Sequence, residues 1–96
     1  MRYQEAFQDL AEVALIQEPP ECQSNYWLQT LKLSDLVASE RDEILAAIND
    51  AGLMTRPVWK LLHTLVPYQN CPRAPLPIAE SLEKRLINLP SSAGMV

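Results

Sequence analysis

Apolar positions along the chain fall at helical spacing in three places. Residues 39–51 carry an apolar stripe, crowd acids into the first turn and are followed by Gly52, so they predict a helix with a glycine stop. Ser39 is expected to cap this helix through its hydroxyl. Residues 2–11 and 77–86 carry similar stripes, and they predict two further helices.

Between these helices the pattern changes to that of extended chain. Residues 25–33 are aromatic and apolar without Gly or Pro, so they predict the central strand. Shorter strands are expected at 13–16, around Arg56 and at 87–89, since Pro57 pushes Arg56 toward an extended conformation. Together these elements predict one α+β domain over residues 1–96, with a small, mostly antiparallel sheet and helices packed on one face.

The two ends of the chain are expected to differ from the body. No capping residue precedes the first helix, so residues 1–12 are interpreted as the end of a longer, domain-linking helix. Pro90 is expected to stop the last strand and leave residues 91–96 as a loose tail.

Composition excludes several classes of protein. With 48% hydrophobic and 21% charged residues the chain is globular, and it has no apolar run of the ~20 residues that a membrane span needs. Its net charge of −4 argues against a nucleic-acid partner. One His and two separated Cys predict no metal site, and ordinary thiols fit a cytoplasmic protein.

Charge is unevenly distributed. Residues 1–50 hold ten acids and three bases, whereas residues 51–79 hold no acid and three bases, Arg56, Lys60 and Arg73. We call residues 51–79 the acid-free window. It predicts a surface that faces an anion. The alternative is an ordinary strand whose surface cations happen to cluster.

Catalytic signatures are missing from the sequence. There is no glycine-rich phosphate loop and no nucleophile or zinc-protease motif. His63 is either a site residue or a core imidazole, and Trp27 and Trp59 are either contact residues or packing residues. These features alone indicate a binding or accessory domain.

Several motifs in one order nevertheless resemble a known family. They are residues 24–28 (Ser-Asn-Tyr-Trp-Leu), 41–43, 52–59 (Gly-Leu-Met-Thr-Arg-Pro-Val-Trp), His63, Tyr68 and 86–92. In this order and spacing they resemble the C-terminal domain of DegT/StrS-type sugar aminotransferases, over nearly the whole chain. The branch most similar makes 4-amino-4,6-dideoxy UDP-sugars for the bacillosamine and legionaminic-acid pathways.

The resemblance implies a small domain of a fold-type I enzyme that depends on pyridoxal phosphate. Such an enzyme moves an amino group, here expected from glutamate, to a keto group of a nucleotide-linked 4-keto-6-deoxy sugar. The family's N-terminal domain supplies the cofactor lysine, and Lys32, Lys60 and Lys84 lie outside that motif. The resemblance therefore implies no catalytic residue here, an isolated chain that is inactive, an N-terminal cofactor domain as partner, and a homodimeric parent enzyme.

What the resemblance carries over is a contribution to the substrate cleft. The implied substrate-binding residues are Arg56, Trp59, Lys60, His63, Tyr68, Asn25 and Trp27. Arg suits such a role because its guanidinium makes charge-assisted, bidentate contacts with phosphate. Two hypotheses remain: a domain of a nucleotide-sugar aminotransferase, or a free-standing, non-catalytic binding or oligomerisation module left by a truncated gene.

Overall fold

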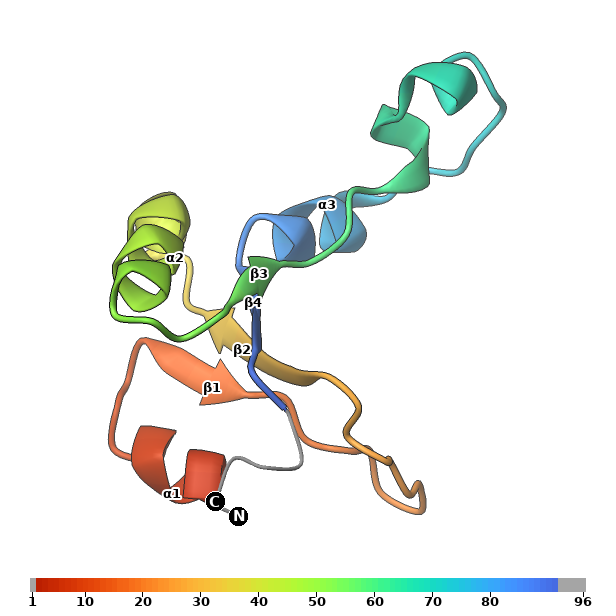
Figure 1. Cartoon of the computed structure of the whole chain (residues 1–96). Coiled ribbons are helices and arrows are strands. Elements are labelled where there is room, and N and C mark those ends of the chain that lie inside the picture. Colours follow the sequence, from red (N-terminus) through yellow and green to blue (C-terminus); the bar gives the residue numbers. More distant parts are fainter. Residues whose placement is uncertain (1, 92–96) are drawn as a thin grey trace.

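A four-stranded antiparallel sheet, in the order β1-β2-β4-β3, organises the molecule (Figure 1). The computed structural model describes residues 2–91. Its strands are β1 Val13–Leu15, β2 Gln29–Leu33, β3 Arg56–Pro57 and β4 Leu86–Leu89, and its helices are α1 Arg2–Phe7, α2 Arg41–Asp50 and α3 Pro77–Glu83. The predicted α+β class and the predicted order of elements are confirmed.

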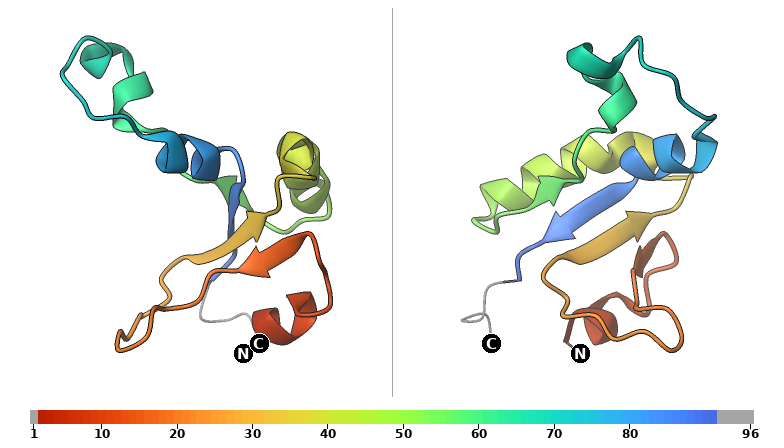
Figure 2. Two further views of the ribbon diagram at one scale, coloured as in Figure 1. Left: turned by 180° about the vertical axis from the view of Figure 1, so that it is seen from behind. Right: turned by 90° about the vertical axis from the view of Figure 1, so that its right-hand side faces the viewer.

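The two central strands supply the core. Leu31 and Leu33 of β2 and Ile87 and Leu89 of β4 are buried, and Leu31 lies directly opposite Ile87. Alternate residues of a strand share a face, so all four side chains lie on the same side of the sheet. Figures 1 and 2 show α1 and α2 on one side of the sheet, with α3 across from α2. Apolar side chains of α1 and α2, but none of α3, pack against this cluster among the described residues.

The first helix is shorter than predicted. It was predicted over residues 2–11 but ends at Phe7, and Leu10 is half exposed beyond the helix end. The chain must reverse there because Val13 pairs with Leu33 at the start of β1. Tyr3 still fixes α1 to the end of the sheet, since its hydroxyl donates to the carbonyl of Pro90 at 2.7 Å.

The central strand also starts later than predicted. It covers Gln29–Leu33, and residues 25–28 form a turn instead. Tyr26 has φ +48°, a left-handed conformation that breaks the extended chain. The side chain of Asn25 accepts from the backbone N–H of Trp27 at 3.1 Å, so Asn25 closes the turn rather than extending the strand.

The two ends of α2 gave one wrong and one correct prediction. Ser39 does not cap the helix, because residues Ala38–Glu40 form a 3-10 turn and Glu40 holds the cap position without a side-chain hydrogen bond. At the other end Gly52 has φ +87°, as predicted. The N–H of Gly52 bonds to the carbonyl of Asn49, and that of Leu53 bonds to Ile48, which together form a Schellman motif.

Directly after this motif, a buried polar pair starts β3. Thr55 is 1% exposed, and its N–H donates to Oδ1 of Asn49 at 3.2 Å. Nδ2 of Asn49 donates in return to Oγ1 of Thr55 at 2.8 Å and to its carbonyl at 3.2 Å. Arg56 and Pro57 then pair with Asn88 and Ile87 of β4. The end of α2 therefore fixes where the edge strand begins.

Pro77 opens α3 near its N-terminus, as predicted, but the helix ends at Glu83. The predicted helix ran to residue 86, but Lys84 holds the C-cap position and Arg85 lies beyond the helix. Arg85 is used in the sheet instead, because its guanidinium donates to the carbonyl of Leu33 at 3.2 Å. Of the loose tail predicted at 91–96, only Ser91 is among the described residues.

Residues 58–76 extend away from the sheet, and we call them the arm (Figures 1 and 2). The arm contains two 3-10 turns, Leu62–Thr64 and Val66–Tyr68. It gives the molecule a radius of gyration of 15.0 Å, against about 12 Å for a compact domain of this length. Several of its apolar side chains, Leu62 and Val66 among them, are exposed.

None of the helices formed by residues 2–91 has the length and apolar character needed to cross a bilayer.

Candidate functional site

The acid-free window, residues 51–79, contains both β3 and the arm. Arg56 is exposed on β3, which is the edge strand of the sheet. Its guanidinium donates to the carbonyl of the preceding residue, Thr55, at 3.1 Å. Among the described residues, no carboxylate lies within ion-pair distance of Arg56. The guanidinium therefore keeps most of its donors available to a ligand.

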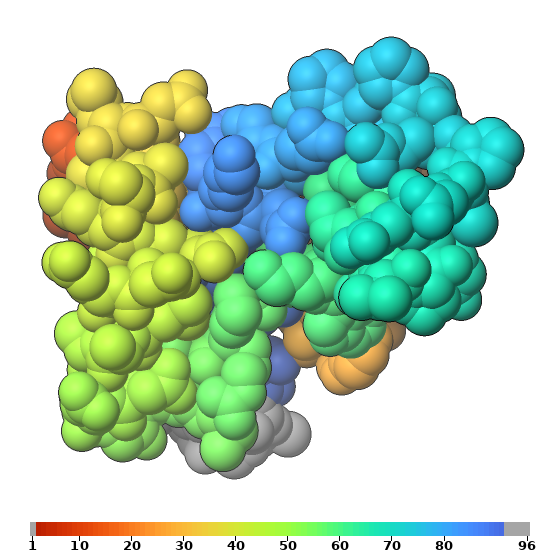
Figure 3. Space-filling model, turned by 90° about the horizontal axis from the view of Figure 1, so that it is seen from above, coloured from red at the N-terminus to blue at the C-terminus, as the bar shows by residue number. Residues whose placement is uncertain are grey.

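A cavity of about 580 Å³ lies within the arm, and Ala79 of α3 completes its wall. Lys60, His63, Tyr68 and Arg73 bring polar groups to it, and leucines of the arm make much of the rest of the wall. Its volume falls in the range of small-molecule sites. Three of the seven predicted residues, Lys60, His63 and Tyr68, therefore share one cavity. Figure 3 shows the arm alongside α3 on this face of the molecule.

Acids of α3 face the cations of the arm. Nε2 of His63 lies 3.1 Å from Oε1 of Glu80, and the His63 side chain is almost buried. Nζ of Lys60 lies 3.5 Å from Oε1 of Glu83. The window is free of acids in sequence but not in space, so α3 partly neutralises it. His63 is thus neither a free ligand group nor a core imidazole, because its ring ties the arm to α3.

Arg73 was not among the predicted site residues, yet it lines the cavity. The sequence did offer a reason to include Arg73, because it is the third cation of the acid-free window. It offered no such reason for Glu80 or Glu83. They lie on another element, and only the folding of the arm against α3 brings them close.

Trp27 and Trp59 form a separate pair. Their ring centroids are 6.4 Å apart and their planes are tilted by 58°. Both indoles are largely exposed. The space-filling view shows orange atoms of the β1–β2 connection beneath the arm (Figure 3). Neither tryptophan belongs to the buried core, and their role as substrate contacts stays a prediction.

Asn25 contributes to this pair indirectly. Its carboxamide oxygen accepts from the N–H of Trp27, and the hydroxyl of Ser91 donates to the Trp27 carbonyl at 2.6 Å. Asn25 therefore positions the backbone of Trp27 through its carboxamide oxygen.

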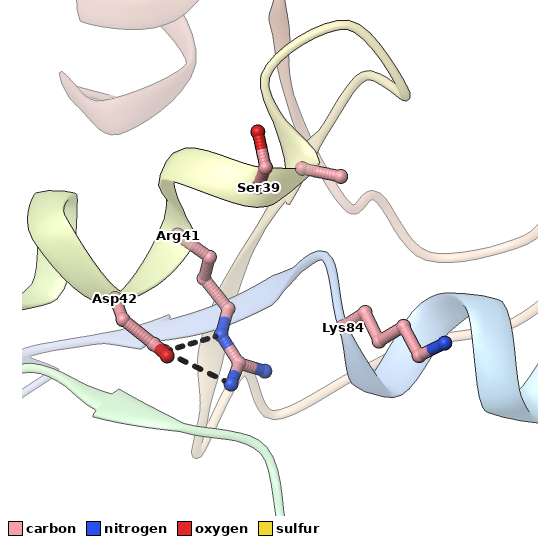
Figure 4. Close-up of a pocket in the computed structure, with 5 residues that line it drawn as sticks. Ser39, Arg41, Asp42 and Lys84 are labelled. Atoms are coloured by element: carbon pink, nitrogen blue, oxygen red, sulfur yellow. Dashed lines mark hydrogen bonds and ion pairs between the residues drawn. The ribbon is translucent and has the colours of Figure 1, made fainter.

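A second depression lies at the start of α2 and is lined by Ser39, Arg41, Asp42 and Lys84 (Figure 4). Nε and Nη2 of Arg41 donate to Oδ1 of Asp42 at 3.2 and 3.1 Å, and Nη1 donates to the carbonyl of Glu83. The guanidinium is thus used in holding α2 against the end of α3. Figure 4 shows Lys84 pointing away from this group. We assign the depression a structural role.

The described residues do not fit pyridoxal phosphate. A lysine that attacks the cofactor aldehyde is activated by an apolar pocket or by a second cation. Lys60 is the lysine at the large cavity, but its side chain is 72% exposed and faces Glu83. Lys32 lies in β2 and Lys84 at the end of α3. No group of three or more His, Cys, Asp or Glu able to hold a metal ion occurs within residues 2–91.

Comparison with known proteins places the chain among aminotransferases. A sequence model of the DegT/DnrJ/EryC1/StrS aminotransferase family matches residues 1–96. A GDP-perosamine synthase of Caulobacter vibrioides is 30% identical over 70 residues, which cover 73% of this chain and 19% of that protein.

Solved structures of aminotransferases share the fold. DesI, solved in the presence of its TDP-sugar product, matches with a TM-score of 0.81 and 27% identity over 93% of this chain. PseC of Helicobacter pylori, an aminotransferase involved in the biosynthesis of pseudoaminic acid, matches with a TM-score of 0.80 and 21% identity over 92% of this chain. The chain spans 23% and 24% of these two structures. It thus corresponds to about a quarter of such a protein.

Proposed function

The chain belongs to the DegT/DnrJ/EryC1/StrS aminotransferase family, and we propose that it is the C-terminal, substrate-cleft domain of a pyridoxal-phosphate-dependent enzyme. That enzyme transfers an amino group, from glutamate, to a keto group of a nucleotide-linked 4-keto-6-deoxy sugar. The cofactor is held by the N-terminal domain of the parent, because the residues of this chain do not fit it. A cytoplasmic, homodimeric parent enzyme belongs to the same proposal.

One observation carries the proposal: the stretch from β3 along the arm presents cations and aromatic rings on one side of the domain. Arg56 is exposed on the edge strand, and Lys60, His63 and Tyr68 surround a cavity of about 580 Å³. A nucleotide-linked sugar combines a diphosphate with a ring that carries hydroxyls. Cations suit the former, and a mixed polar and apolar cavity suits the latter.

A more specific part of the proposal is the identity of the nucleotide to which the sugar is linked. The motifs of residues 52–59 favour a UDP-linked sugar of the bacillosamine and legionaminic-acid type. The matched relatives are named for GDP-perosamine and for a TDP-sugar. A competition between UDP-, TDP- and GDP-linked sugars therefore decides this point.

The alternative function is a free-standing binding or oligomerisation module. The exposed apolar side chains of the arm favour it, since such surfaces commonly mark protein contacts. The DNA directly upstream discriminates the two hypotheses. An in-frame extension the size of a cofactor domain supports the aminotransferase, whereas its absence supports the module.

The binding proposal is tested by titrating the chain with UDP-N-acetylglucosamine and following amide chemical shifts. We expect shifts concentrated in residues 54–73, with a dissociation constant of ~1 mM or weaker, because half a cleft leaves most of the ligand in water. Shifts confined to residues outside 54–73 would refute the site.

The cofactor part has its own test. Pyridoxal phosphate is added, the mixture is reduced with borohydride, and the protein is digested and analysed by mass spectrometry. We expect no preferential labelling of Lys60 over Lys32 and Lys84, and no turnover with glutamate as amino donor. Selective trapping on Lys60 would show that the chain carries its own cofactor lysine.

A further inference from the structure

Trp27 and Trp59 are the only tryptophans of the chain, and both are exposed to an unusual extent. Trp27 is 67% exposed and Trp59 is 75% exposed. They come from distant segments, the β1–β2 connection and the start of the arm, yet their ring centroids lie 6.4 Å apart. Two large aromatic rings gathered at the surface without a cover form a ready contact surface for a flat apolar group.

The geometry decides how a flat group can bind. Stacked rings lie about 3.5 Å apart, so a ring inserted between two others needs parallel planes and roughly 7 Å between them. Here the centroids are closer, and the planes are tilted by 58°. A ligand cannot enter between the two indoles. It can stack on whatever face of the exposed Trp59 ring the tilted Trp27 ring leaves open.

Charge points to the class of ligand. Trp59 lies between Arg56 and Lys60 in the sequence, within the acid-free window. Lys60 faces Glu83, whereas Arg56 has no carboxylate partner among the described residues. An exposed flat ring three residues along the chain from an available guanidinium matches a molecule that joins an aromatic base to phosphates. Proteins bind single nucleotides of nucleic acids with the same two elements.

Trp27 is held in place by its backbone. Its N–H donates to the side chain of Asn25, and its carbonyl accepts from Ser91. The preceding residue, Tyr26, has φ +48°, and its hydroxyl accepts from the N–H of Glu18 at 3.0 Å. These contacts hold the backbone of the turn that carries Trp27, so the position from which its ring extends is set before any ligand arrives.

We propose that the open face of Trp59 stacks on the base of a nucleoside diphosphate while Arg56 contacts its phosphates, and that Trp27 is a positioning residue beside Trp59. This rests on the proposed function and adds which part of the substrate each residue takes. Every nucleobase has a stacking face, so Trp59 contributes nearly equally to uracil, thymine and guanine nucleotides. Discrimination between bases then resides in groups other than this pair.

The test follows the indole N–H signals of the chain, of which there are two, during titration with UDP, uridine and ribose 5-phosphate. We expect UDP and uridine to shift the Trp59 signal and ribose 5-phosphate to leave it in place. Trp59→Ala should weaken UDP binding on the order of tenfold, and Trp59→Phe should retain most of it. Trp27→Phe should cause a smaller loss of UDP affinity than Trp59→Ala.

Circular dichroism verifies that each variant is folded, and the exposure of Trp59 makes its substitution tolerable. Equal shifts with ribose 5-phosphate and UDP, or unchanged UDP affinity in Trp59→Ala, would overturn the stacking proposal. The proposed function fails separately, when UDP-N-acetylglucosamine leaves residues 54–73 unshifted. A nucleotide sugar that shifts those amides but neither indole would leave the site standing and refute the role of Trp59 alone.

Discussion

Replacing Asn49 by Ala tests whether the buried pair at the end of α2 holds β3 in place. The Asn49 side chain is the partner of the Thr55 N–H, which is buried, and of the Thr55 hydroxyl. The Thr55 carbonyl keeps a second donor in Arg56, so it is not orphaned. The substitution therefore leaves one buried N–H without a partner and removes the Nδ2 donor of the Thr55 hydroxyl. The weaker contact with the Thr55 carbonyl and the Nδ2 bond to the Leu45 carbonyl within the helix are lost as well.

The expected loss follows mainly from the first two of these contributions. A buried donor left unpaired costs ~1–3 kcal/mol, and a lost hydrogen bond costs about 1 kcal/mol. We expect Asn49→Ala to lower the free energy of unfolding by roughly 3 kcal/mol. For a domain of this size the corresponding decrease in Tm is about 12–24 °C.

Urea denaturation followed by far-ultraviolet circular dichroism measures this loss. Tryptophan fluorescence is a poor probe here because both indoles are already exposed in the folded state. Thr55→Val removes one hydroxyl and leaves the backbone N–H paired, so it should cost only about 1 kcal/mol. Asp50→Ala is the matched control, since Asp50 is adjacent and exposed, and it should change stability by no more than about 0.5 kcal/mol.

Two outcomes would contradict the reasoning. A loss below about 0.5 kcal/mol for Asn49→Ala would mean that water or another group satisfies the Thr55 N–H. Equal losses for Asn49→Ala and Thr55→Val would place the whole effect in the hydroxyl contact. In either case the start of β3, and with it Arg56, would depend on its pairing with β4 rather than on α2.

Three further changes probe the core, α1 and the arm. Leu33→Ala empties a fully buried position and should cost ~2–5 kcal/mol in urea denaturation, whereas Leu36→Ala, at an 86% exposed position, should change little. Tyr3→Phe removes the hydroxyl that donates to the Pro90 carbonyl, and it should lower the free energy of unfolding by about 1 kcal/mol. Amide exchange in α1 should become faster, and unchanged exchange would show that apolar packing alone holds the helix. His63→Ala breaks the contact with Glu80 and should speed amide exchange in residues 62–68 severalfold. Glu80→Gln keeps a hydrogen-bonding partner for His63 and should have a smaller effect. Equal effects of the two variants would mean that the contact depends on the charge of Glu80.

The sequence predicted the elements better than their ends. The stripe of α2 and the Arg-Pro pair of β3 are local signals, and Gly52 adopts the positive φ that its place after a helix suggests. The errors arose where tertiary pairing competes with local preference. Residues 25–28 have good strand composition, but Tyr26 turns the chain so that Gln29 can pair with Leu89. Composition does not encode that register.

The candidate site was predictable in its residue types but not in its arrangement. The acid-free window identified Arg56 and Lys60 as candidates, and His63 was a candidate because it is the single histidine of the chain. What sequence spacing could not give is the partner of each group. Glu80 and Glu83 lie on α3, and they reach His63 and Lys60 only because the arm folds back against that helix. The contact between Trp27 and Trp59 likewise joins segments that are far apart along the chain.

The described part of the domain has a small apolar core and many exposed apolar side chains. Only four apolar side chains are buried within residues 2–91, while Leu36, Val66 and Ile78 are 86%, 81% and 75% exposed on three separate segments. Exposed apolar groups on several segments indicate contact with a larger surface, in keeping with a chain that spans about a quarter of the aminotransferase structures it matches. The ties from α3 to His63 and Lys60 hold the arm in one position without such a surface. On the function proposed above, we therefore expect the isolated chain to bind a nucleotide sugar only weakly.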